Sequence, residues 1–429
     1  MTASATSRPT PRIVMHTGKG GVGKTTLSAA TAIAAAQVGH RTLLLSTDPA
    51  HSVADVLGTD LTADPARVAG VDGLWAAQVD TRGRFEQAWS DIRDYLVGVL
   101  SARGIAQVQA QELTVLPGAD EVVALLEVLR HARGGDFDVI VVDCAPSGES
   151  LKLLALPETI RFYGDRLMGA PARLMRTLAA GFAGLTGHRT DAAGAAGAAA
   201  PSAAAISDSL GRLLDNLTAA RELLADNNIT GIRLVVTPER VVIAEARRLL
   251  TAFALHGFAV ESVLVNRVLP EDQDHGPFLT AWRAAQSACW PSITESFGRL
   301  RIHEVSMTAQ EPVGPVRLGA IALQLFGGLD PVADPVPSCG LRTEGADGRY
   351  RLLLELPLAD RGDIELSRAG DDLIVTVGPQ RRRIALPSVL QRCRTTGATF
   401  EGDALVIEFE ADPDLWPAAL AGSLGAGAR

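Results

Sequence analysis

Short apolar runs alternate with segments of helical periodicity along the first three quarters of the chain. The runs are continuous rather than alternating, which is the pattern of strands buried on both faces. Strands are expected at 12–17, 41–47, 74–79, 137–142, 232–236 and 260–265, and helices at 24–38, 85–100, 121–132 and 242–256. Because parallel strands are joined by crossover helices, the pattern predicts an α/β domain at 12–326, with a mostly parallel sheet covered by helices on both faces.

Beyond residue 348 the pattern changes to strict alternation. Apolar side chains share one face at Tyr350, Leu352, Leu354 and Leu356, at Leu373, Val375 and Val377, and at Leu405, Ile407 and Phe409. Period-two alternation between Gly, Pro and Asp turns is typical of antiparallel strands. We therefore predict a small antiparallel β-sandwich at 349–412, preceded by a linker at 327–348 and followed by a tail at 413–429.

A helical subdomain is expected within the α/β domain, at about 85–130 and 160–226. The Gly-, Ala- and Ser-rich stretch at 186–205 predicts a mobile loop. Before it, apolar side chains recur at spacings of three, four and seven residues, at Phe162, Leu167, Met168, Leu174, Met175, Leu178, Phe182 and Leu185. This stripe suits a groove for an apolar client segment, and it is equally consistent with ordinary packing between helices.

Length, charge and cysteine content exclude several classes of protein. A chain of 429 residues exceeds what one core usually supports, and a net charge of −9 argues against nucleic-acid binding. The first twelve residues carry no apolar signal segment, and no uninterrupted apolar run of about 18 residues is present, so a cytoplasmic protein is expected. The cysteines, Cys144, Cys289, Cys339 and Cys393, are widely separated, so no zinc site is predicted.

The strongest chemical signal is a glycine-rich loop between the first strand and the first helix. Its residues fit G-x-x-x-x-G-K-[ST], a pattern in which backbone N–H groups and a helix N-terminus hold phosphates. Lys24 is expected to reach the β- and γ-phosphates, and the Thr25 hydroxyl to bind Mg²⁺. The predicted ATP-binding residues of the loop are Gly18, Lys19, Gly20, Gly21, Val22, Gly23, Lys24, Thr25 and Thr26.

The distribution of lysine strengthens this interpretation. Of 40 basic residues only three are lysines, and two of these, Lys19 and Lys24, lie in the loop. Lys is retained where a compact ammonium must enter a tight space that the planar Arg fork does not fit. Lys19 marks the deviant form of the Walker A loop, in which this lysine reaches a nucleotide across a dimer interface; the alternative is a solvated loop charge.

Two carboxylates and one amide follow buried strands. Asp143 occupies the Walker B position and is predicted to hold Mg²⁺ through water. Asp48 is placed to orient the attacking water and to contribute to the metal site, so Asp48, Lys19 and Lys24 are the predicted catalytic residues. Asn266 suits recognition of adenine by its amide, and a turn-forming asparagine fits the spacing as well.

Several motifs together resemble the ArsA-type ATPases, which include arsenite-pump ATPases and the ATPase that guides tail-anchored proteins to membranes. They are KGGVGKTT, STDPAHS (46–52), PGADE (117–121), VVDCAPSGES (141–150) and VNRVLP (265–270). The resemblance implies a homodimer closing over two ATP molecules, with Lys19 acting in trans and Asp48 activating water. It also implies that Asp143 couples to the second switch and that Asn266 contacts the base.

The sequence also departs from the ArsA pattern. The second switch of the family usually reads DTAPTGH, and here Cys144 and Glu149 replace Thr and His. The C-x-x-C that joins the eukaryotic targeting dimer and a cysteine triad for arsenite are both absent. The segments RIALP (383–387) and GDALVI (402–407) resemble the α-crystallin domain of small heat-shock proteins, which some bacterial ArsA-like ATPases carry.

These patterns favour a homodimeric, Mg²⁺-dependent ATPase that controls binding of a hydrophobic client segment, as a targeting factor or chaperone. A membrane receptor or pump is a further expected partner, and nucleic acid is not. One alternative is an ATPase subunit that drives arsenite or metalloid efflux. Another is a nucleotide-gated holdase with little turnover. A DNA-partitioning ATPase is disfavoured by the negative charge.

Overall fold

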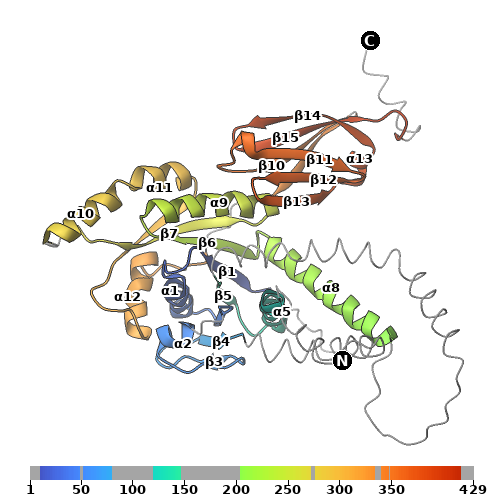
Figure 1. The fold of residues 1–429 in the computed structure, drawn as a ribbon. Helices are drawn as coiled ribbons and strands as arrows, with labels where there is room; N and C mark the ends of the chain where they lie inside the picture. The colour runs from blue at the N-terminus through green and yellow to red at the C-terminus, as the bar shows by residue number, and fades with distance from the viewer. Residues whose placement is uncertain are drawn as a thin grey trace, which may run out of the picture. The chain divides into compact units, whose positions relative to one another are not determined.

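The computed structural model of the chain describes residues 10–48, 52–79, 119–145, 203–271, 276–333, 340–346 and 348–416 (Figure 1). The chain divides into two compact units. The larger unit consists of Met1–Val79, His131–Leu151 and Leu223–Arg429, and the smaller unit of Asp80–Arg130 and Lys152–Glu222. The glycine loop and the β-sandwich both belong to the larger unit.

An eight-stranded sheet forms the centre of the larger unit, in the order β3-β4-β2-β5-β1-β6-β7-β8. Its strands are β1 (Arg12–Thr17), β2 (Thr42–Ser46), β3 (Ala66–Arg67), β4 (Leu74–Gln78), β5 (Val139–Asp143), β6 (Thr230–Val236), β7 (Val260–Val268) and β8 (Arg301–Ser306). Neighbouring strands pair in parallel, except for the short antiparallel pair of β3 and β4. Every residue of β2 and β5 is buried, as the continuous apolar runs predict. The prediction of a mostly parallel sheet is confirmed.

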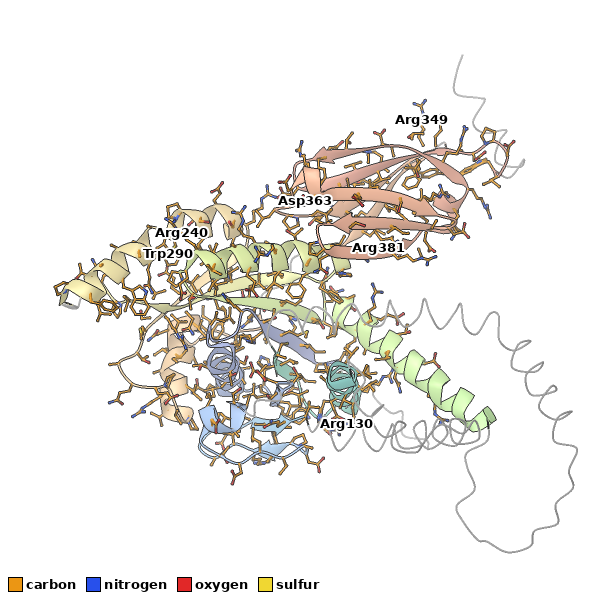
Figure 2. All side chains as sticks on the ribbon, viewed as in Figure 1. Arg130, Arg240, Trp290, Arg349, Asp363 and Arg381 are labelled. Atoms are coloured by element: carbon orange, nitrogen blue, oxygen red, sulfur yellow. The ribbon has the colours of Figure 1, made fainter. Side chains whose placement is uncertain are left out.

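Helices cover both faces of this sheet (Figure 1). They are α1 (Lys24–Gln37), α2 (Ser52–Leu57), α9 (Arg240–His256), α10 (Gly276–Ser287), α11 (Trp290–Phe297) and α12 (Pro315–Phe326). Figure 2 shows Arg240 and Trp290 at the starts of α9 and α11. Helix α1 contacts both β5 and α12, and its many alanines permit this close packing. The helix that carries the glycine loop at its N-terminus is therefore held on several sides.

Two layers of antiparallel strands form the C-terminal domain, which confirms the predicted β-sandwich. One sheet has the order β14-β15-β10-β9 and the other β11-β12-β13. The strands are β9 (Leu341–Ala346), β10 (Arg349–Glu355), β11 (Ile364–Ala369), β12 (Asp372–Val377), β13 (Gln380–Ala385), β14 (Cys393–Glu401) and β15 (Ala404–Ala411), with a short helix α13 (Ser388–Gln391). Strand β9 lies within the range assigned to the linker, because its sequence Leu-Arg-Thr-Glu-Gly-Ala lacks an apolar alternation.

The sandwich packs against α9 of the ATPase part of the same unit. Leu255 of α9 is fully buried within the sandwich core cluster, beside residues such as Leu354 and Val375. Thr251 Oγ1 donates a hydrogen bond to the Pro357 carbonyl at 2.7 Å, and Arg382 Nη1 donates one to the Leu255 carbonyl at 2.6 Å. The Arg382 charge at the C-terminal end of α9 also interacts favourably with the helix dipole. Helix α9 therefore joins the two cores.

In the smaller unit the structure describes α8 (Ala203–Ala225) and most of α5 (Ala119–Gly134). Helix α5 matches the helix expected at 121–132. Helix α8 begins at Ala203, so the last three residues of the range predicted as a mobile loop are helical. The expected helix at 85–100 and the apolar stripe at 162–185 lie outside the described residues. Among the helices that are described, none is both long and apolar enough to cross a bilayer.

We predict that Leu255→Ala loosens the sandwich from α9. Truncation of a buried leucine costs about 2–5 kcal/mol, and here the lost contacts belong to the sandwich core. Hydrogen exchange of the β10 and β13 amides should become faster. Leu249→Ala is the matched control, since Leu249 is a buried α9 residue outside that cluster. Equal exchange of the sandwich amides in the two variants would contradict this role of Leu255.

Candidate active site

The residues predicted to bind nucleotide come from neighbouring strands that end at one edge of the sheet. Strand β5 lies between β2 and β1, and Asp143 at its end is in register with Ser46 and His16. The Thr47 N–H donates to the Asp143 carbonyl at 3.0 Å, which fixes the chain leading to Asp48 beside the end of β5. In an open α/β sheet, ligands bind outside the carboxyl ends of the strands. The loop, Asp48 and Asp143 meet at that edge.

The glycine loop is tightly fitted to its surroundings. A Cβ atom on Gly18, which has a φ of 154°, would lie 2.3 Å from the Val235 carbonyl oxygen. A Cβ atom on Gly23, which has a φ of 92°, would lie 2.3 Å from Asn266 Nδ2. Any side chain at either position would collide with its neighbour and strain the backbone. The glycines therefore permit the close backbone approach that a phosphate-binding loop requires.

Lys24 begins helix α1 directly after the loop and is 7% exposed. Its Nζ donates a hydrogen bond to the Lys19 carbonyl at 3.3 Å, so the ammonium lies over the loop. The free N–H groups of the helix N-terminus lie at the same place and favour an anion. The side chain of Lys19 is half-buried, whereas Gly20 and Gly21 are exposed.

Asp143 is fully buried and is held by two hydroxyl groups of α1. Thr25 Oγ1 donates to Asp143 Oδ2 at 2.8 Å, and Ser28 Oγ donates to Oδ1 at 3.2 Å. Burial raises the pKa of Asp143 to about 6, against the lowering effect of the Thr25 hydrogen bond and of Lys24. The negative charge of Asp48 raises this pKa further. The two predicted carboxylates are thus close enough to interact.

The oxygen atoms at this point fit a magnesium site. Mg²⁺ prefers oxygen ligands and usually takes one or two carboxylates, several waters and the substrate phosphates. Asp143 and Thr25 supply a carboxylate and a hydroxyl, and Ser52 Oγ lies 3.2 Å from Thr25 Oγ1. Neither Ser28 nor Ser52 was predicted as a site residue from the sequence. Ser28 had a signal, since it lies one helical turn after Lys24 on the same face.

Asn266 contacts the loop itself in this structure. It is 8% exposed, and its Nδ2 donates a hydrogen bond to the Val22 carbonyl at 2.8 Å. Its Oδ1 accepts a hydrogen bond from the Arg267 N–H at 2.9 Å, and Arg267 has a φ of 58°. Asn266 therefore lies within β7, beside an irregularity in its pairing with β8, rather than in the turn of the alternative interpretation, and it also fixes the glycine loop. Its contact with adenine stays a prediction.

The second predicted switch is described only in part. Cys144 is buried, and its N–H donates to the His16 carbonyl at 3.2 Å, so this replacement for Thr continues the pairing of β5 with β1. Glu149 lies outside the described residues.

A strand, a tight glycine loop and a helix bring a lysine and a hydroxyl against a buried carboxylate at the end of a neighbouring strand. This arrangement defines the class of P-loop nucleoside triphosphatases.

Within that class, residues 11–327 match the ArsA ATPase family, described as anion-transporting ATPases, and the chain belongs to this family. Residues 347–409 match the HSP20-like domain found in ArsA, which confirms the resemblance to small heat-shock proteins. The chain is therefore an ATP-hydrolysing enzyme with an HSP20-like C-terminal domain.

Two named relatives illustrate the similarity. A Chlorobaculum tepidum protein named as an arsenical pump-driving ATPase is 34% identical over 399 residues, covering 93% of this chain and 96% of its own. The ATPase GET3 of Candida glabrata is 29% identical over 337 residues, covering 74% of this chain and 90% of its own.

We predict that Asp143→Asn lowers ATPase activity while stabilising the fold at pH 8. The folded-state pKa of about 6 lies above the ordinary value of 3.8, so the ionised carboxylate destabilises the folded protein above that pH. The cost is on the order of 3 kcal/mol and disappears as the pH falls from 6 towards 4. The midpoint of thermal unfolding, measured without Mg²⁺ and nucleotide, should therefore rise at pH 8 and converge with that of the unchanged protein at lower pH.

Asp138→Asn is the control for this measurement. Its hydrogen bonds from Arg41 lower the pKa of Asp138, so the sign is reversed and no stability is gained at pH 8. If Asp143→Asn were no more stable than the unchanged protein at pH 8, the assigned burial cost would be wrong.

Proposed function

We propose that this ATPase works as a Mg²⁺-dependent homodimer whose nucleotide state controls the binding of a hydrophobic client segment in the cytoplasm. The observation that supports the catalytic part most directly is the Thr25–Asp143 hydrogen bond at 2.8 Å, with the Lys24 ammonium over the adjacent loop. The similarity to the ATPase GET3 and the HSP20-like domain support the client-binding part.

Each residue of the site has a distinct role in the proposed hydrolysis. Lys24 and the loop N–H groups bind the phosphates and stabilise the charge that develops on them. Thr25 and Asp143 hold Mg²⁺, which neutralises phosphate charge when it is bound. Asp48 accepts a hydrogen bond from the attacking water and orients it towards the γ-phosphorus. Asp143 must be ionised for its role, so Mg²⁺ binding should compete with protonation of its carboxyl group.

Lys19 is proposed to act on the partner's nucleotide. Its backbone carbonyl is occupied by Lys24 of the same chain, while its side chain is half-buried at the open edge of the loop. A cation supplied across an interface stabilises the transition-state charge in the manner of an arginine finger. Such a device makes turnover depend on dimer closure.

Mixing two inactive variants tests this arrangement. Lys19→Ala and Asp48→Asn should each abolish turnover, and Asp48→Asn should retain ATP binding. If Lys19 acts in trans, a mixed dimer contains one intact site, so an equimolar mixture should regain about one quarter of full activity in a phosphate-release assay. If the mixture stays inactive although mixed dimers form, Lys19 acts in cis or the protein has no shared site.

The client prediction is tested with a purified apolar peptide. In the presence of ATP and Mg²⁺, the Asp48→Asn protein should retain a labelled peptide of about 20 apolar residues, the length of a membrane span, and ADP should release it. The control is the same peptide with four central residues changed to Asp. Equal retention in ATP and ADP would contradict nucleotide control. Nucleotide-dependent retention by an unchanged protein that hydrolyses little ATP would favour the holdase alternative.

The similarity to a protein named as an arsenical pump-driving ATPase supports the alternative function in metalloid efflux. Metalloid binding needs thiolates brought together, and the described cysteines, Cys144, Cys289 and Cys393, are buried on separate elements. Arsenite stimulation of ATP hydrolysis that is lost in a Cys144→Ser, Cys289→Ser or Cys393→Ser variant would replace the client proposal by this alternative.

A further inference from the structure

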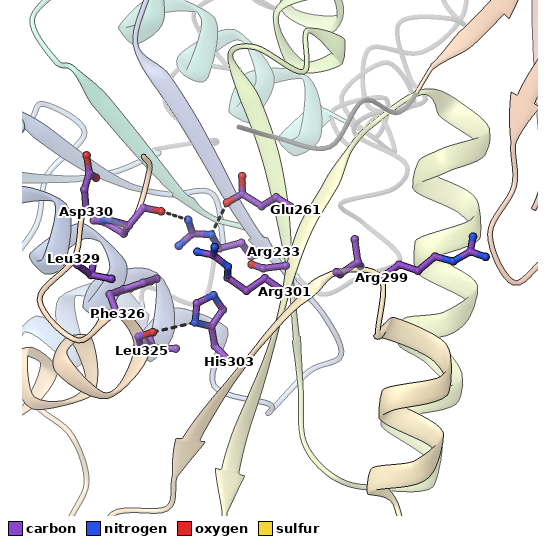
Figure 3. Close-up of a pocket in the computed structure, with 12 residues that line it drawn as sticks. Arg233, Glu261, Arg299, Arg301, His303, Leu325, Phe326, Leu329 and Asp330 are labelled. Carbon is purple, nitrogen blue, oxygen red and sulfur yellow. Dashed lines mark hydrogen bonds and ion pairs between the residues drawn. The ribbon is translucent and has the colours of Figure 1, made fainter. Parts of the chain in front are cut away.

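A pocket of about 400 Å³ lies in the larger unit, lined by residues of β6, β7, β8 and the end of α12 (Figure 3). Glu261 and Ser262 lie near the start of β7, and Arg301 and His303 near the start of β8. These are the amino ends of the strands, whereas the glycine loop and Asp143 lie at the carboxyl ends. The pocket is therefore separate from the nucleotide site, and its volume is within the usual range for small-molecule sites.

Arg233 of β6 carries a buried guanidinium group that is not fully paired. The residue is 4% exposed. Its Nε donates to Glu261 Oε1 at 2.5 Å, and its Nη2 donates to the Pro331 carbonyl at 2.5 Å (Figure 3). Its third nitrogen, Nη1, is buried and has no hydrogen-bond partner among the described residues. A buried cationic donor without a partner is costly, and an anion in the pocket would supply that partner.

The charges around Arg233 leave this end of the sheet positive. Glu261 is shared, because its second oxygen accepts a hydrogen bond from Arg12. Arg301 adds a third guanidinium group, and it lines the pocket (Figure 3). Asp330 on the pocket wall is hydrogen-bonded by His40 Nε2 at 3.0 Å and by the Val332 N–H at 2.9 Å.

Two further polar groups face the same space. Ser262 Oγ is buried and has no hydrogen-bond partner within the described ranges. His303 Nδ1 donates to the Leu325 carbonyl at 2.9 Å, which directs its Nε2 away from that carbonyl. Burial lowers the pKa of His303 against the raising effect of the Leu325 hydrogen bond, and the charges of Arg233 and Arg301 lower this pKa further. Most of the remaining wall is apolar and includes Leu300, Leu325, Phe326 and Leu329.

We propose that this pocket binds a small organic anion, in which a carboxylate or phosphate group is held by Arg233 Nη1, Ser262 and Arg301 while an apolar portion lies against Phe326 and Leu329. Guanidinium groups match both oxyanions in a bidentate manner. Phe326 already stacks on Arg233, with the guanidinium carbon 5.3 Å from the ring centroid, so the apolar and cationic walls are continuous.

Titration calorimetry on the full chain tests the proposal. The protein is kept in excess Mg²⁺-ADP so that the glycine loop is filled, and benzoate and phenyl phosphate are added in separate arms. At least one should bind, and the arm that binds identifies the anionic group. Arg301→Gln should weaken binding about tenfold and Ser262→Ala by a smaller factor, since hydrogen bonds to charged groups carry most of the affinity.

Arg299→Gln is the matched control. Arg299 lies two residues before Arg301 and also lines the pocket, but its side chain is 81% exposed, is paired with Asp403 and points away from Arg233 (Figure 3). Its substitution should change the dissociation constant less than about twofold. Arg301 is itself exposed, so its substitution does not disturb the core. Absence of binding in both arms, or equal binding by Arg301→Gln and the unchanged protein, would overturn the proposal.

Discussion

The hydrogen bond from Thr25 to the buried carboxylate of Asp143 is the constraint on which the rest of the site depends. It joins the first turn of α1 to the end of β5, so the loop before the helix has one position relative to the sheet. The core around α1 keeps it there, because alanines let the helix approach β5 and α12 closely. The same core removes water from Asp143 and raises its pKa, which ties catalytic charge to burial.

The two edges of the sheet have different chemistry. The carboxyl edge gathers the loop, Asp48 and Asp143, whereas the amino edge gathers Arg12, Arg233 and Glu261. Helix α1 runs from the first edge towards the second, and His40, which follows it, contacts Asp330 on the wall of the arginine-lined pocket. One rigid element therefore lies between the nucleotide site and that pocket.

The features that could be predicted from the sequence are those encoded by residues close together in the chain. Continuous apolar runs identified β1, β2, β5, β6 and β7. The loop motif identified Thr25, whose hydroxyl contacts Asp143 in the structure. Strands β8 and β13 were missed because Arg-Ile-His-Glu-Val-Ser and Gln-Arg-Arg-Arg-Ile-Ala are edge sequences with mostly exposed or half-buried side chains. The hydrogen-bond partners of Arg233 could not be predicted from the sequence, since Glu261 and Pro331 are distant from it in the chain. The hydrogen bond from Asn266 to the Val22 carbonyl likewise joins residues that are distant in the chain.

The packing of Leu255 makes the small C-terminal domain part of the support of helix α9. Because this α9 residue completes the sandwich core and its carbonyl is bound by Arg382, the helix is a structural member of both domains. The stabilities of the sandwich and of α9 are consequently coupled, so local unfolding of one should destabilise the other. An ATPase domain separated from the sandwich would expose Leu255, so unfolding of the sandwich should lower the local stability of the C-terminal end of α9.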